Sequence, residues 1–116
     1  MRNITFQKFR LAALAISLST VAMLAQAQTV DVASAEALMK LSKCTKCHSV
    51  DKQKDGPSFK KTAAKYKGKP DAEAKLFTHL TTGPKVKIDN VEEDHTIVKS
   101  KDEAEIKNLI RYILSR

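Results

Sequence analysis

The chain has 116 residues, a formal net charge of +8 and two cysteines. Its lysines are spread along the sequence and aromatic residues make up only 5% of it, which argues against a nucleic-acid-binding surface, where basic clusters and stacking aromatics are expected. A disulfide between the two cysteines would close a very short loop, so it would add little stability.

The first 27 residues have the pattern of an export signal. Three basic residues precede the uncharged, mostly apolar run 11–25, which ends in the small-x-small pattern Ala25-Gln26-Ala27. This run is shorter than the roughly 20 residues needed to span a bilayer. We therefore expect a signal peptide over residues 1–27 that is cleaved after Ala27, a periplasmic location, and no stable membrane insertion afterwards. The mature domain, residues 28–116, would keep a net charge of +5, because the signal carries three basic and no acidic residues.

The mature sequence predicts four helices and no strand. Apolar residues recur at helical spacing over 34–44, 58–66, 71–81 and 101–115. Ser34 is the expected N-cap of the first helix. Residues 85–100 show no clear period and are predicted to be irregular. The fold class indicated is a small all-α domain, whose thin core a large apolar cofactor would complete.

The motif that carries chemistry is Cys44-Thr45-Lys46-Cys47-His48. Zinc needs about four ligands, and no second cysteine pair or closely spaced histidine pair follows. A thioredoxin-like redox pair starts a helix within a βαβ unit, whereas here the predicted helix precedes the motif. A catalytic cysteine is disfavoured too, because exposed thiols in an exported protein tend to oxidise.

The remaining interpretation of this motif is haem attachment. Cys-x-x-Cys-His is the signature of covalent haem c. Two thiols three residues apart can reach the two vinyl groups on one porphyrin edge as thioethers, and the next residue then lies under the ring as the proximal iron ligand. Together with an export signal, the motif predicts one haem c attached through Cys44 and Cys47, with His48 on the iron.

These features make the chain similar to the small class I c-type cytochromes of bacteria, of the c-551/c-552 type. The resemblance spans about residues 33–116 and includes the Cys44–His48 motif, the stretch GPSFKKTAAKYKG at 56–68, and Tyr112 near the chain end. It implies a class I cytochrome c fold, with about four helices around one haem and a close contact between the first and last helices. It also implies that the Pro57 carbonyl accepts a hydrogen bond from His48, although Pro57 by itself also fits a plain turn.

The distal ligand is where the chain departs from this family. The family usually supplies a methionine from the loop before the last helix, and this chain has none there. Met39 lies on the first predicted helix and is expected to fill the core. His95 occupies the methionine's approximate place, so we predict iron ligation by His48 and His95. The alternatives are His79, a lysine such as Lys85 or Lys87, or an open site.

Bis-histidine ligation has predicted consequences. Methionine ligation raises the reduction potential of such haems, so we expect a potential below that of a His/Met relative. The neighbouring carboxylates Glu92, Glu93 and Asp94 raise a second possibility. They would favour a protonated His95 that leaves the iron at low pH, unless they are simply a solvated loop.

The function expected is a monomeric periplasmic electron carrier that acts with redox partner proteins and is not an enzyme. The alternative is a haem protein that binds or senses a small ligand, such as carbon monoxide or nitric oxide, at a displaceable sixth position. An acidic redox partner would be recognised by exposed lysines, unless these are ordinary surface charge. The lysines in question are Lys43, Lys46, Lys52, Lys54, Lys85 and Lys87.

Overall fold

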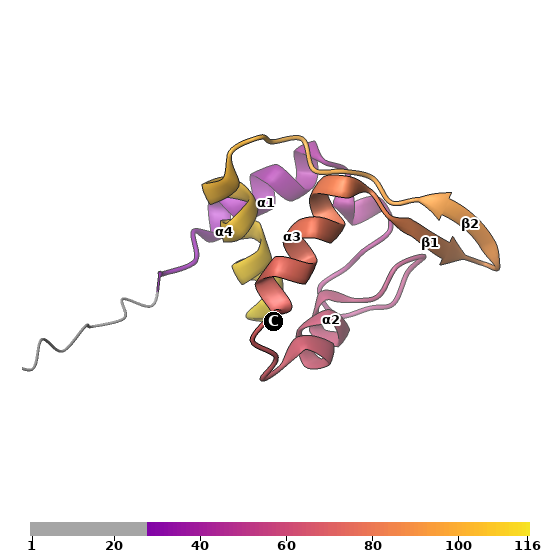
Figure 1. Cartoon of the computed structure of the whole chain (residues 1–116), viewed down its shortest axis with the longest axis horizontal. Coiled ribbons are helices and arrows are strands. Elements are labelled where there is room, and N and C mark those ends of the chain that lie inside the picture. Colours follow the sequence, from indigo (N-terminus) through magenta and orange to yellow (C-terminus); the bar gives the residue numbers. More distant parts are fainter. Residues whose placement is uncertain (1–27) are drawn as a thin grey trace, which may run out of the picture.

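The computed structural model describes residues 28–116, so the predicted signal peptide lies outside the described residues. The described chain is mainly helical, as predicted, with a small two-stranded hairpin (Figure 1). Its elements are α1 (Val32–Leu41), a 3₁₀ turn (Cys44–Lys46), α2 (Phe59–Tyr66), α3 (Ala72–Thr82), β1 (Lys85–Ile88), β2 (Val91–Asp94) and α4 (Glu103–Leu114). Over residues 28–116, no helix combines the length and apolar character needed to cross a membrane.

Helix α4 lies at the centre of the hydrophobic core. Helices α1, α2 and α3 all pack against it, and its residues Leu109 and Ile110 have no exposed surface. Helix α1 brings Leu38 and Met39 to this core, so Met39 fills it as predicted. Each such side chain stabilises the fold by about 1.5–3 kcal/mol through burial. The first and last helices are therefore in direct contact, as the resemblance implied.

Helix α1 starts earlier than predicted. Asp31 is its N-cap, and its Oδ1 accepts a hydrogen bond from the Ser34 backbone N–H at 3.0 Å. The expected cap, Ser34, thus lies inside the first turn. Asp31 also forms two backbone hydrogen bonds with Asn108 of α4. Its N–H donates to the Asn108 side-chain oxygen at 2.9 Å, and its carbonyl accepts from the Asn108 side-chain amide at 2.8 Å. This contact with α4 sets the helix start, and sequence periodicity carries no sign of it.

Helix α1 also ends earlier than predicted, at Leu41 and not at Cys44. Lys43 adopts the left-handed conformation with φ of 59°, which no α-helix accommodates. Cys44 therefore begins a separate 3₁₀ turn. Its carbonyl accepts the His48 N–H at 2.9 Å, so the two cysteines and the histidine wind round one tight turn.

Helices α2 and α3 match the predicted positions to within about a residue at each end. Ser58 caps α2, and its Oγ accepts the Lys61 N–H at 3.2 Å. Gly83 terminates α3 in the left-handed conformation, with φ of 61°. This is the ordinary way in which a glycine ends a helix.

The prediction of an irregular segment over 85–100 is wrong for its first half. Strands β1 and β2 form an antiparallel hairpin whose register pairs Lys85 with Asp94 and Ile88 with Val91. The two residues between the strands, Asp89 and Asn90, both have positive φ, 48° and 67°. Two-residue hairpin turns need this conformation, and Asp and Asn tolerate it better than most residues. The hairpin is short and largely exposed, so it has little of the apolar alternation that reveals a strand.

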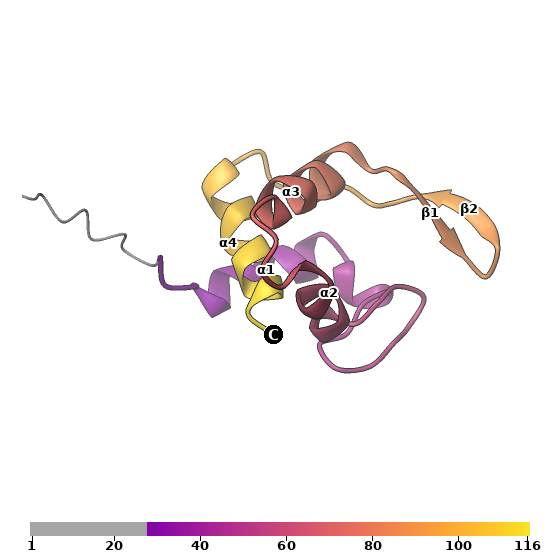
Figure 2. The ribbon, with the colours of Figure 1, turned by 60° about the horizontal axis from the view of Figure 1, so that its bottom comes forward.

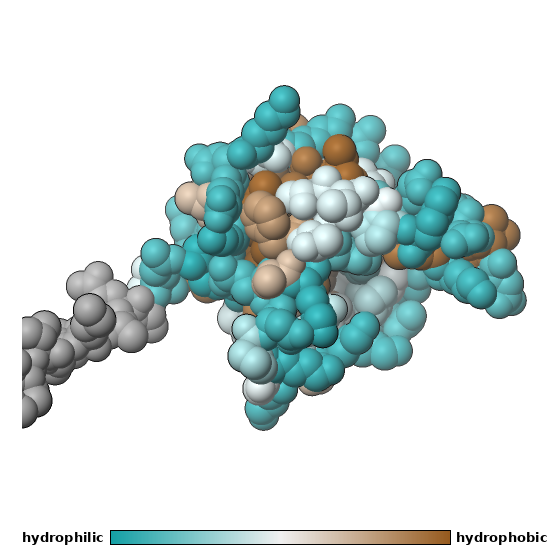
Figure 3. Space-filling model, viewed as in Figure 1, coloured by the Kyte–Doolittle hydropathy of each residue, from teal (hydrophilic) through white to brown (hydrophobic). Residues whose placement is uncertain are grey.

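The hairpin projects from the helical body. In two views it lies on the same side as the loop that leads from His48 to α2 (Figure 1, Figure 2). The space-filling view shows apolar surface on the projecting part, among hydrophilic neighbours (Figure 3). Val91 is 57% exposed there, and Ile97, just beyond the hairpin, is 52% exposed. The motif loop and the hairpin therefore flank the same end of the molecule.

Candidate functional site

The His48 ring is held by the loop that follows it. Its Nδ1–H donates to the Pro57 carbonyl at 2.7 Å, and the ring stacks on Phe59 with centroids 5.6 Å apart. The loop itself is closed by backbone bonds from the Gly56 N–H to the Cys47 carbonyl at 2.8 Å and from the Phe59 N–H to the Ser49 carbonyl at 2.9 Å. With Nδ1 occupied, only Nε2 is free to bind a metal.

Gly56 gives the His48 ring its space. A Cβ at this position would lie 2.4 Å from Cε1 of His48 and 2.8 Å from its Nδ1. Those distances are far inside van der Waals contact, so the ring occupies the place of a side chain. The loop and the ring form one packed unit, and any larger residue at Gly56 displaces one of them.

The two cysteines are free, half-buried thiols. Burial raises the pKa of Cys44 above its ordinary value. Redox-active Cys-x-x-Cys pairs depend on a lowered thiol pKa and a position at a helix start. Here the pair sits in a 3₁₀ turn after a helix. The geometry therefore disfavours a thioredoxin-like role.

His95 follows β2 directly, and its ring lies near that of His48. The two ring centroids are 6.1 Å apart, with the planes tilted by 52°. Two imidazoles that bind one metal ion from opposite sides, each with a metal–nitrogen distance of about 2.0 Å, have ring centres roughly 6 Å apart. The observed spacing fits a shared ion, although 47 positions separate the two residues in the sequence.

His79, on α3, lies beside His95, at a centroid distance of 4.2 Å. The ring contacts of His48 within residues 28–116 are with Phe59 and His95. His79 thus packs against the ring of His95. Within residues 28–116, His95 is thus the histidine whose ring pairs with both of the others.

The environment of His95 keeps its ring neutral. Burial, with smaller effects from the nearby His79 and His48, lowers its pKa to about 4. Its Nδ1 is buried without a hydrogen-bond partner. Burial also lowers the pKa of His79. A metal-binding imidazole must be neutral, so this environment suits a ligand.

The carboxylates Glu92, Glu93 and Asp94 do not have the effect that their sequence proximity suggested. All three are exposed on β2, and none contributes to the pKa of His95, which is lowered and not raised. The acid run is therefore a solvated strand, the second of the two interpretations that the sequence left open. Asp94 instead forms an ion pair with Lys85 at 2.8 Å.

A metal ion bound by protein groups alone does not fit the site. Among residues 28–116, no cluster of three or more His, Cys, Asp or Glu side chains could hold one. His48 and His95 alone would leave most coordination positions of a metal ion unfilled, so the metal would need a group that brings further donors. A haem meets that requirement, and the free thiols of Cys44 and Cys47 next to His48 provide attachment points. The residues present fit a covalent haem.

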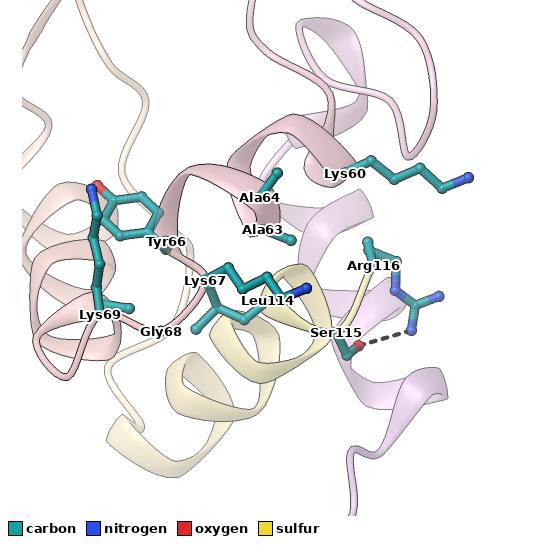
Figure 4. A pocket seen from close by; sticks show the side chains of 11 residues that line it. Lys60, Ala63, Ala64, Tyr66, Lys67, Gly68, Lys69, Leu114, Ser115 and Arg116 are labelled. Atoms are coloured by element: carbon teal, nitrogen blue, oxygen red, sulfur yellow. Dashed lines mark hydrogen bonds between the residues drawn. The ribbon is translucent and has the colours of Figure 1, made fainter.

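A second surface feature lies elsewhere. A depression of about 570 Å³ opens between α2 and the end of α4, and its lining includes Lys67, Lys69 and Arg116 (Figure 4). The Arg116 guanidinium donates a hydrogen bond to the Ser115 hydroxyl at 3.1 Å, drawn as a dashed line in Figure 4. The depression contains no histidine or cysteine and shares no lining residue with the histidine cluster. It is unrelated to the Cys-x-x-Cys-His motif.

The structure adds functional candidates that sequence reasoning missed. Gly56, Phe59 and Gly83 contact the two neighbouring histidines or their backbone. The Asp89-Asn90 pair was the one local signal of the hairpin. No local pattern marks the other contacts, because they join residues that are distant in the sequence or depend on the absence of a side chain.

Comparison with known proteins places these features in a family. The family model for cytochrome c matches residues 32–116. Cytochrome c-551 of Pseudomonas denitrificans is 44% identical over 50 residues, which cover 43% of this chain and 61% of that protein, so the chain matches less than two thirds of this relative's length.

Solved structures agree with this match. The class 1 cytochrome MtoD from Sideroxydans lithotrophicus ES-1 has a TM-score of 0.72 at 52% identity, covering 75% of this chain and 97% of that one. Cytochrome c552 of Nitrosomonas europaea has a TM-score of 0.54 at 28% identity, covering 69% of this chain and 96% of that one. The chain therefore belongs to the cytochrome c family, as a small class I c-type cytochrome whose cofactor is one covalent haem c.

Proposed function

We propose that this chain is an exported monohaem electron carrier with bis-histidine ligation. Cys44 and Cys47 are its attachment residues, and His48 and His95 are its iron ligands. The observation that carries the proposal is the pair of neighbouring imidazoles, whose ring centroids are 6.1 Å apart, one of them in the Cys-x-x-Cys-His motif. Residues 1–27 serve as the signal peptide, and the cleaved protein works in the periplasm as a monomer.

The proximal residues orient the ligand and tune its donor strength. Haem c, when bound, supplies a one-electron couple between ferric and ferrous iron. The Pro57 carbonyl accepts the Nδ1–H of His48 at 2.7 Å, which fixes the tautomer and raises the basicity of Nε2. Phe59 supports the ring face. A ligand held in this way needs no rearrangement when the charge on the iron changes.

The distal residue lowers the reduction potential. A second imidazole is a stronger donor than a methionine thioether, so it stabilises the ferric state. Burial keeps His95 neutral at physiological pH, with a pKa of about 4. We therefore expect a potential below that of a His/Met relative. A firmly held sixth ligand also disfavours the alternative role in binding small gases, which needs a vacant position.

A partner is recognised through lysines on the motif side. Lys43, Lys46, Lys52 and Lys54 are exposed there. The other two lysines predicted for this surface, Lys85 and Lys87, have acidic neighbours in the hairpin. Lys85 is paired with Asp94 at 2.8 Å, and Lys87 lies across from Glu92 in the hairpin register. The motif-loop lysines have no such cross-strand acidic neighbour, so an acidic partner approaches this loop.

Low-temperature EPR of the ferric mature protein tests the ligation. We expect a low-spin signal in the wild type, its loss in His95→Ala, and its retention in His79→Ala, the control that removes the adjacent imidazole. A high-spin wild type would mean an open site. A low-spin signal that persists in His95→Ala would assign the ligand elsewhere. A redox titration in the usual His/Met range would contradict the expected potential.

Ferricyanide, an anionic oxidant, tests the docking surface. Lys52→Glu/Lys54→Glu should slow oxidation of the ferrous protein and weaken its dependence on ionic strength. Lys67→Glu/Lys69→Glu is the matched control, because it reverses two exposed charges at the same spacing beside the depression in Figure 4. Equal slowing by both pairs would show that net charge alone matters and would contradict a local docking surface.

A further inference from the structure

We propose that Gly83 is a positioning residue for the sixth iron ligand. Together with Pro84 and the backbone of residues 95–98, it forms a clasp that holds His95 against the end of α3. This proposal rests on the proposed ligation by His95. It goes further in assigning the placement of that ligand to the base of the hairpin, and not to its strands or tip.

The first part of the clasp is a hydrogen bond beyond the strands. The last pair in the hairpin register is Lys85 with Asp94. One step further toward the body, the His95 N–H donates to the Pro84 carbonyl at 2.9 Å. The ladder therefore continues to the ligand itself. The Lys85–Asp94 ion pair at the same end is exposed, so it adds little to the closure.

The second part is a close approach of two backbone segments at Gly83. A Cβ on this residue would lie 2.6 Å from the His95 carbonyl oxygen and 3.0 Å from Cγ2 of Ile97. The nearer atom belongs to the backbone, so it cannot swing aside as a flexible side chain can. Any side chain at position 83 must move His95 or α3. Gly83 also has φ of 61°, a conformation that glycine adopts at little cost.

The third part holds the chain after His95. The Val98 N–H donates to the Leu80 carbonyl at 2.9 Å, and Val98 is buried. The Leu80 carbonyl lies in the last turn of α3, where carbonyls have no partner within the helix. The Lys99 N–H donates to the Ser42 hydroxyl at 2.9 Å and so ties the same segment to the end of α1.

These contacts restrict the movement of His95, the proposed ligand. Its backbone is held at His95 by Pro84, just after α3, and three residues later by Leu80 of α3. Its ring lies beside His79 of the same helix. Exchange with a competing ligand then requires the clasp to open as well as the iron bond to break. A chain without the clasp would compete less well, because the entropy of ordering a free loop would oppose binding.

Cyanide binding to the ferric holoprotein tests the clasp, with spin state read by EPR. We expect Gly83→Ala to bind cyanide about tenfold more tightly, or to show a high-spin fraction, because the added methyl group displaces His95. Gly68→Ala is the matched control: Gly68 also has a left-handed φ, 72°, yet nothing lies within 4 Å of its would-be Cβ. It should bind cyanide within about twofold of the wild type.

Gly83→Asn and Gly68→Asn repeat the comparison with a residue that tolerates the left-handed conformation better. Equal cyanide affinity in the Gly83 and Gly68 variants would overturn the proposal. So would failure of both Gly83 variants to accumulate as holoprotein while both Gly68 variants do, since Gly83 would then support the fold and not the ligand.

His95→Ala separates this proposal from the proposed ligation. If His95→Ala binds cyanide tightly but both Gly83 variants match the wild type, His95 is the ligand and the clasp is wrong. If His95→Ala binds cyanide no better than the wild type, His95 is not the ligand. The proposed ligation then fails, and this inference fails with it.

Discussion

The two sides of the site are built in different ways. On the proximal side, the cysteines, His48, Gly56 and Pro57 lie within 14 consecutive residues. A tight turn and a packed ring bring them together. On the distal side, His95 emerges from an exposed hairpin and is held at its base by Gly83 and Pro84. Residues of a short motif are positioned by contacts within the motif and its loop. A single proposed ligand on a long connection depends instead on contacts with a distant helix.

The largest contrast should come from removing each ligand. We expect His48→Ala to prevent accumulation of stable holoprotein, because the proximal imidazole and the two attachment residues form one unit. His95→Ala should keep its covalent haem and become high-spin. Haem content and the optical spectrum of the purified variants measure both effects. Equal losses of holoprotein in the two variants would contradict this difference between the proximal and the distal side.

The next contrast concerns packing at Gly56. Gly56→Ala places a methyl group in the position of the His48 ring, so we expect a loss of about 1–3 kcal/mol in the free energy of unfolding, with altered EPR g-values. Denaturant unfolding of the holoprotein and its ferric spectrum provide the readouts. Gly68→Ala, which has free space around it, should leave the g-values unchanged. Unaltered g-values in both variants would show that the proximal loop adapts freely.

A smaller effect is expected at the tip of the hairpin. Asn90 has φ of 67°, so Asn90→Val should cost about 1–2 kcal/mol, whereas Asn90→Gly should be close to neutral. Neither variant should change the low-spin spectrum, because the contacts that hold His95 lie at the base. Denaturant unfolding measures the loss of stability, and EPR measures the spin state. A high-spin fraction in Asn90→Val would extend the positioning role to the whole hairpin.

The smallest effect concerns pH. Burial lowers the pKa of His95 from an ordinary value of 6.5 to about 4. The unfolded chain therefore takes up this proton as the pH falls from 6.5 toward 4 while the folded chain does not, so the free energy of unfolding should decrease across that window. The low-spin optical spectrum should persist across the same window in an acid titration, because binding to iron further opposes protonation of the ring. A spin-state change near pH 6 would contradict the effect of burial.

The variant His79→Gln sharpens this titration. The neighbouring imidazole is the second-largest cause of the lowered pKa of His95, after burial. Its removal should therefore move the acid transition slightly upward. A downward shift in a variant of the exposed strand, such as Glu93→Gln, would show that the carboxylates act on His95 after all.

The sequence alone determined the features that reside in short, consecutive patterns. Cys-x-x-Cys-His named the cofactor, helical spacing located four helices, and the missing methionine directed attention to His95. The structure corrected helix ends that are set by contacts or backbone conformations which helical spacing does not reveal. Asp31 replaces Ser34 as the first cap because Asn108 holds it, and Lys43 ends α1 through a left-handed φ.

Only the tertiary structure decided how His95, the proposed distal ligand, is placed. The hairpin rests on positive φ at Asp89 and Asn90, and the clasp on the close approach of Gly83 to the His95 backbone. Neither leaves a periodic trace in the sequence. Spacing along a chain specifies chemistry when the reacting groups are neighbours. When they are 47 residues apart, as His48 and His95 are, their distance depends on how α3, the hairpin and α4 pack, and that packing belongs to the whole fold.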